Sequence, residues 1–279
     1  MSVEAAGLSP MERLVPEVNH YIKMLDPLSV SGSSSNPVKL GWNELALSTY
    51  MVFFIIALIL VVAIVFWAKK RMTASPVPKG RAINAFELLV DFVRNNIVGG
   101  CIKHDGEKYT PFILTVFFFI LVSNVVGLIP GCKPSTGTIG ATFALAMIVF
   151  VYFTVVGIAK KGGFGYIKAL VPRGLPKAVV PLIFVIEFAS MLLRPITLGL
   201  RLFANMYAGH IILGIFAILT ELFILAPFEH QGVLNAVVSP VWFLLLVLMY
   251  TLEVAIAGIQ AYVFTLLTAV YIDGAIGEH

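Results

Sequence analysis

A stripe of polar side chains crosses a long apolar stretch of this sequence, and it is the feature best suited to chemistry. Successive members are three, four, three, four and four residues apart, so they share one face of an α-helix. The stripe extends over about 27 Å of helix, close to the roughly 30 Å of a membrane's hydrocarbon core. Its members are Glu187, Ser190, Arg194, Thr197, Arg201 and Asn205. Such a face contacts water, a partner protein or both, or else it forms a seam packed against a neighbouring helix.

Arg201 carries the most isolated charge of this polar stripe. None of the 78 residues that follow it is lysine or arginine, and apolar sequence flanks it on both sides. A guanidinium keeps its proton in proteins, so Arg201 can attract a carboxylate but cannot relay a proton. These two properties indicate an electrostatic gate. The alternative is an arginine that extends to the membrane interface.

A second group able to handle protons consists of His210, Glu253 and Gln260. Glu253 and Gln260 are seven residues apart, which places them on one helical face. Imidazole titrates near neutrality, and burial moves a carboxyl group toward the same range. The group is therefore interpreted as a proton wire, with a structural His210–Glu253 pair as the alternative. His210 is nine residues after Arg201, about 180° round the helix, which suggests two separate aqueous compartments.

The composition excludes a soluble domain. Hydrophobic residues make up 59% of the 279-residue chain and charged residues 12%, against about 25% charged in soluble domains. The net charge of +4 comes from short basic clusters beside apolar runs, which are topology signals, and we expect no nucleic-acid partner. The two cysteines, Cys101 and Cys132, fit neither a disulfide framework nor a metal site. We expect no cofactor and no metal.

Five apolar segments predict an all-α integral membrane protein. The predicted transmembrane helices cover residues 48–68, 110–130, 140–159, 178–226 and 240–272. Basic clusters at Lys69-Lys70-Arg71 and Lys160-Lys161 assign the ends of the first and third spans to the cytoplasmic side. Residues 1–44 are then an external N-terminal segment, residues 45–279 form a single membrane domain, and residues 131–139 form an external connection.

Residues 82–98 form a different kind of helix. Apolar side chains recur there at helical spacing while charged ones lie mostly elsewhere, which is typical of an amphipathic helix on the cytoplasmic surface. We expect its apolar face to contact lipid, and we expect Gly99-Gly100 to end it.

The last two segments are too long to cross a membrane upright. As helices, residues 178–226 and 240–272 would extend about 73 Å and about 50 Å, so they must break or tilt strongly. Break points in the first would be Pro181, Pro195, Gly199, Gly209 and Gly214. The polar turn between the two, residues 227–240, contains no lysine or arginine, which favours the external side. We predict a long, steeply tilted hairpin.

Three stretches of the chain resemble subunit a of F-type ATP synthases, over residues 45–275 in all. The central helix of that family is similar to the run Arg194-Pro-Ile-Thr-Leu-Gly-Leu-Arg-Leu-Phe-Ala-Asn-Met-Tyr-Ala-Gly-His210. Its last helix resembles residues 252–267, with Glu253 and Gln260. Its second span resembles residues 110–130, which include Asn124.

The resemblance implies proton translocation through the Fo part of ATP synthase, driving ATP synthesis. Two offset half-channels would load and unload the carboxylates of a rotating ring of c subunits, and Arg201 would face that ring as the gate. The outer half-channel would be lined by Asn205, His210, Glu253 and Gln260, with Asn124 also on the proton path; the cytoplasmic one would be lined or bordered by Glu187, Ser190 and Thr197.

The resemblance also implies partners and a location. The chain would be the membrane subunit of the two-sector enzyme, without catalytic chemistry of its own. It would contact the c ring, the b subunits of the peripheral stalk and the lipid bilayer directly, and the F1 head only indirectly. Many bacterial members exchange the residues at His210 and Glu253, whereas mitochondrial members share this order. We expect a bacterial inner membrane, with the mitochondrial inner membrane as the alternative.

Two other functions remain open at the sequence level. A secondary cation/proton antiporter also needs buried charges, but it usually has a midplane acidic pair and repeat symmetry, and neither is found. A purely structural membrane subunit of a respiratory complex leaves the polar stripe around Arg201 unexplained.

Overall fold

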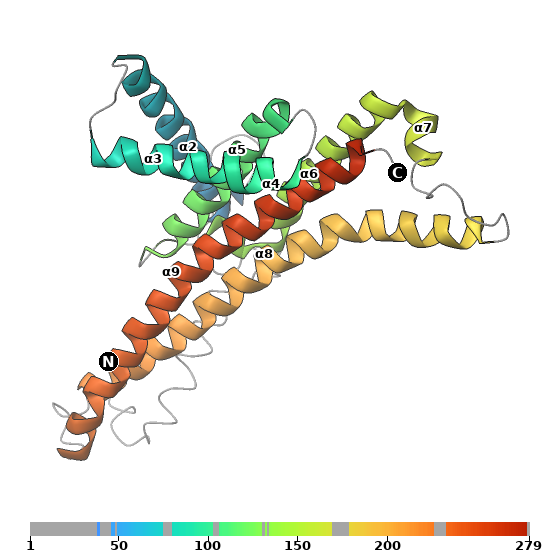
Figure 1. Cartoon of the computed structure of the whole chain (residues 1–279). Helices are drawn as coiled ribbons and strands as arrows, with labels where there is room; N and C mark the ends of the chain where they lie inside the picture. Colours follow the sequence, from blue (N-terminus) through green and yellow to red (C-terminus); the bar gives the residue numbers. More distant parts are fainter. Residues whose placement is uncertain are drawn as a thin grey trace.

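The computed structural model describes residues 38–39, 46–47, 49–74, 80–102, 106–129, 132, 134–168, 179–225 and 233–277. Nearly all of these residues are helical (Figure 1). Five helices are long and apolar enough to cross a membrane, namely Tyr50–Arg71, Gly106–Gly127, Ile139–Lys161, Val180–Thr220 and Pro240–Ile276. The prediction of an all-α membrane protein with five spans is confirmed.

The elements follow one another in the order that the apolar segments predict. They are β1 (Val38–Lys39), β2 (Ala46–Leu47), α2 (Thr49–Ala74), α3 (Arg81–Phe92), the π-helical η2 (Val93–Val98), α4 (Gly99–Cys101), α5 (Gly106–Gly127), the 3₁₀ turn η3 (Ser135–Gly137), α6 (Ile139–Lys161), α7 (Gly163–Lys168), α8 (Val180–Leu225) and α9 (Val233–Ile276). The two short strands pair antiparallel, Val38 with Leu47 and Lys39 with Ala46. Most of the predicted external segment 1–44 lies outside the described residues.

The hairpin of α8 and α9 dominates the shape of the molecule. The two helices have 46 and 44 residues, about 69 Å and 66 Å at the standard rise, and they lie side by side over much of this length (Figure 1). A helix this long fits a membrane core only when it is strongly tilted. Of the two alternatives, breaking or tilting, α8 does not break: the helix continues through Pro195, Gly199 and Gly209 and curves.

The turn of the hairpin is shorter than predicted. Helix α9 begins at Val233 and contains Pro240, so eight residues of the expected turn 227–240 are already helical. Proline is tolerated inside a membrane helix because other groups satisfy the backbone carbonyl that it leaves free. Glu229, His230 and Gln231 of the predicted turn lie outside the described residues.

The amphipathic surface helix is longer than predicted and packs on protein. The chain stays helical from Arg81 through Gly99 and Gly100 to Cys101, so the predicted stop at the two glycines is wrong. Phe86 of α3 stacks on Phe118 of α5, with ring centroids 5.0 Å apart, and Val93 and Ile97 of η2 are fully buried. Much of the apolar face that we expected against lipid therefore covers α5 and α9.

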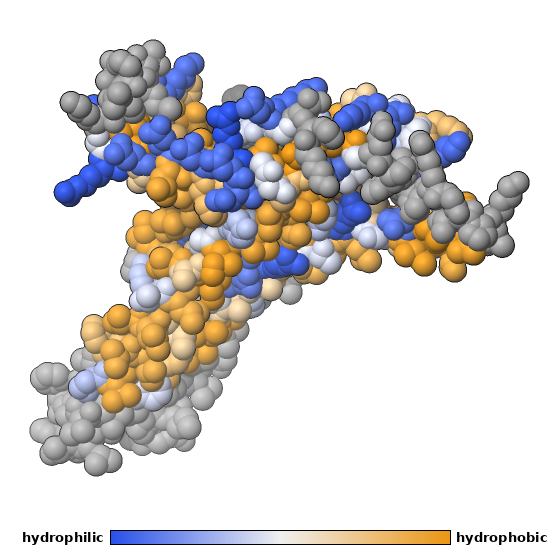
Figure 2. Space-filling view, viewed as in Figure 1, coloured by the Kyte–Doolittle hydropathy of each residue, from blue (hydrophilic) through white to orange (hydrophobic). Residues whose placement is uncertain are grey.

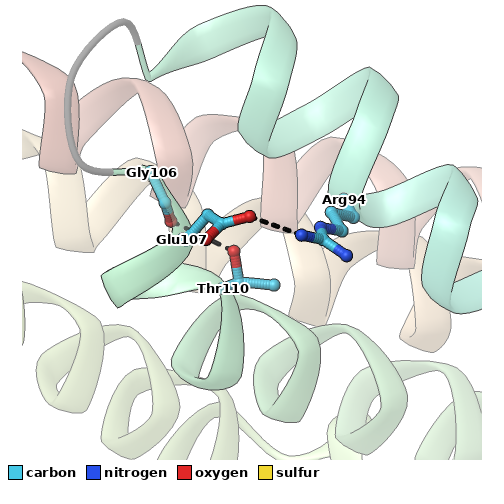
Figure 3. A network of polar contacts seen from close by, with 4 residues as sticks. All are labelled: Arg94, Gly106, Glu107 and Thr110. Atoms are coloured by element: carbon cyan, nitrogen blue, oxygen red, sulfur yellow. Dashed lines mark hydrogen bonds and ion pairs between the residues drawn. The ribbon is translucent and has the colours of Figure 1, made fainter.

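An ion pair joins this surface helix to the start of α5. Arg94 of η2 donates to the carboxylate of Glu107, and the Thr110 hydroxyl donates to the Gly106 carbonyl at 3.0 Å (Figure 3). Both charged side chains are more than half exposed, so screening by water and salt leaves this pair a small effect on stability. The ion pair therefore helps to position η2 against the start of α5 but contributes little to the stability of the fold.

Hydrophilic residues gather at one end of the molecule, over α3, α4 and the end of α6 (Figure 2). At that end Lys161 of α6 donates to the Gly277 carbonyl, at 2.5 Å, just after α9. A Cβ on Gly157 would lie 2.4 Å from the Tyr166 ring, so this glycine lets α7 fold back onto α6. The chain end of α9 therefore lies on the same side as the basic clusters, as the five-span order requires.

The connection between α5 and α6 folds into the protein. We expected only an external link over 131–139, but Pro134, Ser135, Thr136 and Gly137 are buried, and η3 contacts α2, α5, α6 and α8. A Cβ on Gly127 would lie 2.5 Å from Cβ and 2.8 Å from Cα of Pro134. Glycine at 127 is therefore what allows the turn to close against the end of α5.

We expect Gly127→Ala to lower the thermal unfolding midpoint of the purified chain in detergent. The new methyl group overlaps the Pro134 backbone, and overpacking of this kind costs about 1–3 kcal/mol, more than the gain of up to about 1 kcal/mol in helix propensity. Gly140→Ala is the matched control, because no atom lies within 4 Å of a Cβ there. Equal midpoints for the two variants would contradict this packing.

Candidate functional site

The contact between α8 and α9 brings together four of the predicted site residues. Asn205 Nδ2 donates to Gln260 Oε1 at 2.7 Å, and His210 Nε2 lies 3.9 Å from Glu253 Oε1. Because the helices run antiparallel, moving forward along α8 from Asn205 to His210 corresponds to moving back along α9 from Gln260 to Glu253. The grouping predicted from the sequence is therefore present as two cross-helix pairs.

His210 and Glu253 form a buried pair without a direct hydrogen bond. Their side chains are 14% and 4% exposed, and the 3.9 Å between nitrogen and oxygen is too long for a hydrogen bond. Neither Glu253 oxygen nor His210 Nε2 has a hydrogen-bond partner among the residues whose placement is described. Leaving buried polar atoms unpaired costs about 1–3 kcal/mol each. That cost is typical of a functional group rather than of a pair selected to tie helices together.

Gly209 sets how closely the Glu253 carboxyl group approaches α8. A Cβ at this position would lie 2.7 Å from Glu253 Oε1 and 2.9 Å from its Cδ. Any larger residue would displace the carboxyl group from its place beside His210. The sequence had suggested Gly209 only as a helix break; its position next to His210 was the available signal for this role.

Arg201 faces away from the rest of the chain. It lies near the middle of the 41-residue span Val180–Thr220, and its residue is exposed. Leu198, Leu202 and Met206, which are at most 2% exposed, hold an adjacent side of this stretch against the protein. No ion pair or hydrogen bond joins Arg201 to another residue in the described parts of the chain.

The half of the polar stripe that precedes Arg201 also includes exposed residues. Ser190 and Thr197 are exposed, and the Thr197 hydroxyl donates back to the carbonyls of Leu193 and Arg194 at 3.0 and 3.1 Å. Glu187 is half-buried. The structure does not bring Glu187, Ser190 or Thr197 to the His210–Glu253 pair, which agrees with two separate polar regions.

Arg194 packs within the chain. Its guanidinium carbon lies 5.2 Å from the centre of the Tyr271 ring of α9, within the range of a cation–π contact. The alternative interpretation of the stripe, a seam between neighbouring helices, therefore fits Arg194 and also Asn205, which bonds Gln260 of α9, but not the exposed Arg201.

Asn124 of α5 lies inside the protein, with both ends of its amide engaged. Its side chain is fully buried, Nδ2 donates to the Ala257 carbonyl at 3.3 Å, and Oδ1 accepts from the Thr136 hydroxyl at 2.9 Å. The sequence predicted Asn124 on the proton path but gave no signal for Thr136 or Ala257. Among the described residues, no group of three or more His, Cys, Asp or Glu side chains could hold a metal ion.

Comparison with known proteins places these residues in a family. The family model of the ATP synthase A chain matches residues 51–273. ATP synthase subunit a of Hyphomonas neptunium is 36% identical over 239 residues, covering 86% of this chain and 90% of that protein. Subunit a of Myxococcus xanthus is 37% identical, covering 86% and 76%, and that of Rhodospirillum rubrum is 40% identical, covering 77% and 83%.

We expect Asn205 and Gln260 to be energetically coupled. Alanine at either position removes the 2.7 Å hydrogen bond, so the double variant should lose less free energy of unfolding than the sum of the single losses. Direct partners typically differ from additivity by about 0.5–3 kcal/mol, measured here by denaturant unfolding in mixed micelles. The control cycle pairs Asn205→Ala with Thr251→Ala, whose hydroxyl donates to its own helix at Val247; coupling of equal size in both cycles would contradict the assignment.

Proposed function

Since this chain belongs to the ATP synthase A chain family, we propose that it conducts protons through two offset half-channels that load and unload a rotating ring of c subunits. It is a multi-pass inner membrane protein, and its family supports proton translocation through the Fo part of ATP synthase. The single observation that carries this proposal is the exposed Arg201, which has no ion-pair partner among the residues that the structure describes.

The electrostatics of Arg201 require a carboxylate partner from another subunit. A fixed charge near the middle of a membrane-length helix costs several kcal/mol unless it is paired or solvated. Two opposite charges 4 Å apart attract by about 4 kcal/mol at an effective dielectric constant of 20. A ring carboxylate that approaches Arg201 would therefore be held ionised. Because arginine itself does not release its proton, it would block protons from passing directly between the half-channels.

The outer half-channel would run through the α8–α9 contact. Protons from outside would pass the buried His210–Glu253 pair and then the Asn205–Gln260 pair, since these side chains lie between the two helices. Asn205 is four residues from Arg201, about 6 Å along the helix. A proton that reaches Asn205 would thus be delivered beside the gate, where a ring carboxylate accepts it.

The cytoplasmic half-channel would follow the other half of the stripe. Glu187, Ser190 and Thr197 precede Arg201 on α8, toward the end of the molecule that carries Lys160 and Lys161. Arg201 then lies between the two polar regions. A ring carboxylate neutralised on one side would have to travel through lipid, around nearly a full turn, before it releases its proton on the other side.

Peripheral-stalk b subunits would contact the surface formed by residues 69–109. The α3–η2–α4 segment exposes Glu87, Asp91 and Arg94 on the outside of the protein while its apolar side packs inward. A charged surface on a segment that packs against the rest of the protein suits a partner that does not rotate with the ring. The F1 head would be reached only through these partners, and the chain itself would carry out no phosphate chemistry.

Replacing Arg201 with alanine tests the gate. We expect Arg201→Ala to abolish ATP synthesis driven by a proton gradient in membrane vesicles while the complex still assembles, because the ring carboxylate loses its counter-charge. Arg194→Gln is the matched control: its guanidinium lies on Tyr271 rather than outward, so most synthesis should remain. Normal synthesis with Arg201→Ala would rule out the gate.

Replacing the buried pair tests the outer half-channel. We expect His210→Ala or Glu253→Ala to slow ATP-driven proton pumping by at least about tenfold without loss of assembly, and Gly209→Ala to slow it by displacing the Glu253 carboxyl group. Thr251→Ala on the exposed side of α9 should pump normally. Unchanged pumping in both His210→Ala and Glu253→Ala would show that the His210–Glu253 pair has a structural role only.

A further inference from the structure

We propose that Asn124 and Thr136 are positioning residues that fix the rotation of α9 about its own axis, so that Glu253 and Gln260 face α8. This inference rests on the proposed function, because it assigns a purpose to that orientation. It also replaces the sequence-based expectation that Asn124 itself carries protons.

The Asn124 amide bridges two elements from inside the protein. Its Nδ2 donates to the Ala257 carbonyl of α9, and its Oδ1 accepts from the Thr136 hydroxyl of η3. All three residues have little or no exposure, at 0%, 1% and 3% for Asn124, Ala257 and Thr136. With both ends engaged away from the His210–Glu253 pair, this amide is poorly placed to pass protons and well placed to hold α9.

The carbonyl that Asn124 holds lies between the two functional residues of α9. Ala257 is four residues after Glu253 and three residues before Gln260, so it is about one helical turn from each. A constraint at Ala257 therefore sets the direction in which both side chains point.

A second tie holds α9 on the other side of Glu253. The Tyr250 hydroxyl donates to the Leu128 carbonyl, just after α5, at 3.2 Å. Tyr250 is three residues before Glu253, whereas Ala257 is four residues after it. These two attachments to the end of α5, one before and one after Glu253 along the chain, resist rotation of this part of α9 better than either one alone.

Thr136 gives the Asn124 amide its direction. An amide side chain presents a donor at one end and an acceptor at the other, and a hydroxyl that donates to Oδ1 turns Nδ2 toward Ala257. Thr136 itself is fixed by η3, which Pro134 holds against Gly127. The orientation of α9 would thus be set relative to the η3 turn, which contacts α2, α5, α6 and α8.

Small rotations of α9 matter because α8 is so close. A Cβ on Gly209 would already lie 2.7 Å from Glu253 Oε1, and Asn205 and Gln260 are at direct hydrogen-bond distance. Rotation by even a fraction of a turn would separate Gln260 from Asn205 or press the carboxyl group against the α8 backbone.

The experiment measures the orientation of α9 directly, in the assembled complex. Cys101 and Cys132 are replaced by serine, cysteines replace Asn205 and Gln260, and a short bifunctional thiol reagent joins them in membranes. We expect Thr136→Val and Asn124→Leu each to lower the cross-linking yield by roughly threefold to tenfold, the population shift that corresponds to loss of one hydrogen bond. Thr136→Ser, which keeps the hydroxyl, should restore the yield.

A control and a functional readout separate this proposal from the one it rests on. Thr115→Val removes an exposed hydroxyl that bonds only within α5, to Pro111, and should leave the yield unchanged. In chains that keep Asn205 and Gln260, Thr136→Val should slow proton pumping and Thr136→Ser should not. Unchanged cross-linking with Thr136→Val or Asn124→Leu would overturn the positioning role whatever the pumping rate; reduced cross-linking with normal pumping would support it and count against the proposed outer half-channel.

Discussion

A positive charge deep in a hydrocarbon layer must be compensated, and most of this structure can be understood from that requirement. Arg201 lies near the middle of a membrane-length helix and has no carboxylate partner in the described chain. The protein buries an adjacent side of α8 through Leu198, Leu202 and Met206, which leaves the side of Arg201 exposed. On the proposed function, the subunit supplies the charge and the ring supplies its complement.

The acid–base pair is positioned by close approach of the backbones rather than by direct bonding. His210 and Glu253 do not hydrogen-bond each other, and they are held near one another because Gly209 leaves room for the carboxyl group. The neighbouring Asn205–Gln260 bond is the direct link between α8 and α9 at this depth. The two pairs therefore differ in kind: Asn205 and Gln260 bond directly, whereas the facing Nε2 of His210 and the Glu253 oxygens have no hydrogen-bond partner among the described residues.

Composition and periodicity were enough to predict the class of fold and the five spans, because hydropathy and helical spacing are local properties, whereas the grouping of Asn205 with His210, Glu253 and Gln260 rested on the resemblance to the family. They failed where a residue has two opposite uses. Gly199 and Gly209 were considered as possible break points, yet in α8 they permit close contacts with α6 and α9. The buried turn around Thr136 was also missed, since its polar, glycine-containing sequence is typical of an exposed loop. Which use a glycine has depends on a neighbour far along the chain, and sequence periodicity does not contain that information.

The outward direction of Arg201 has a consequence for how the protein is made. During synthesis α8 enters the bilayer before any partner is necessarily beside it, with a bare guanidinium among lipid tails and a broad apolar flank around it. A helix with an uncompensated charge is costly in the membrane, so on the proposed function the isolated chain would be less stable in the bilayer than the chain docked against its ring. The cell would then have to produce this subunit in step with its partners, because excess copies would keep that charge uncompensated.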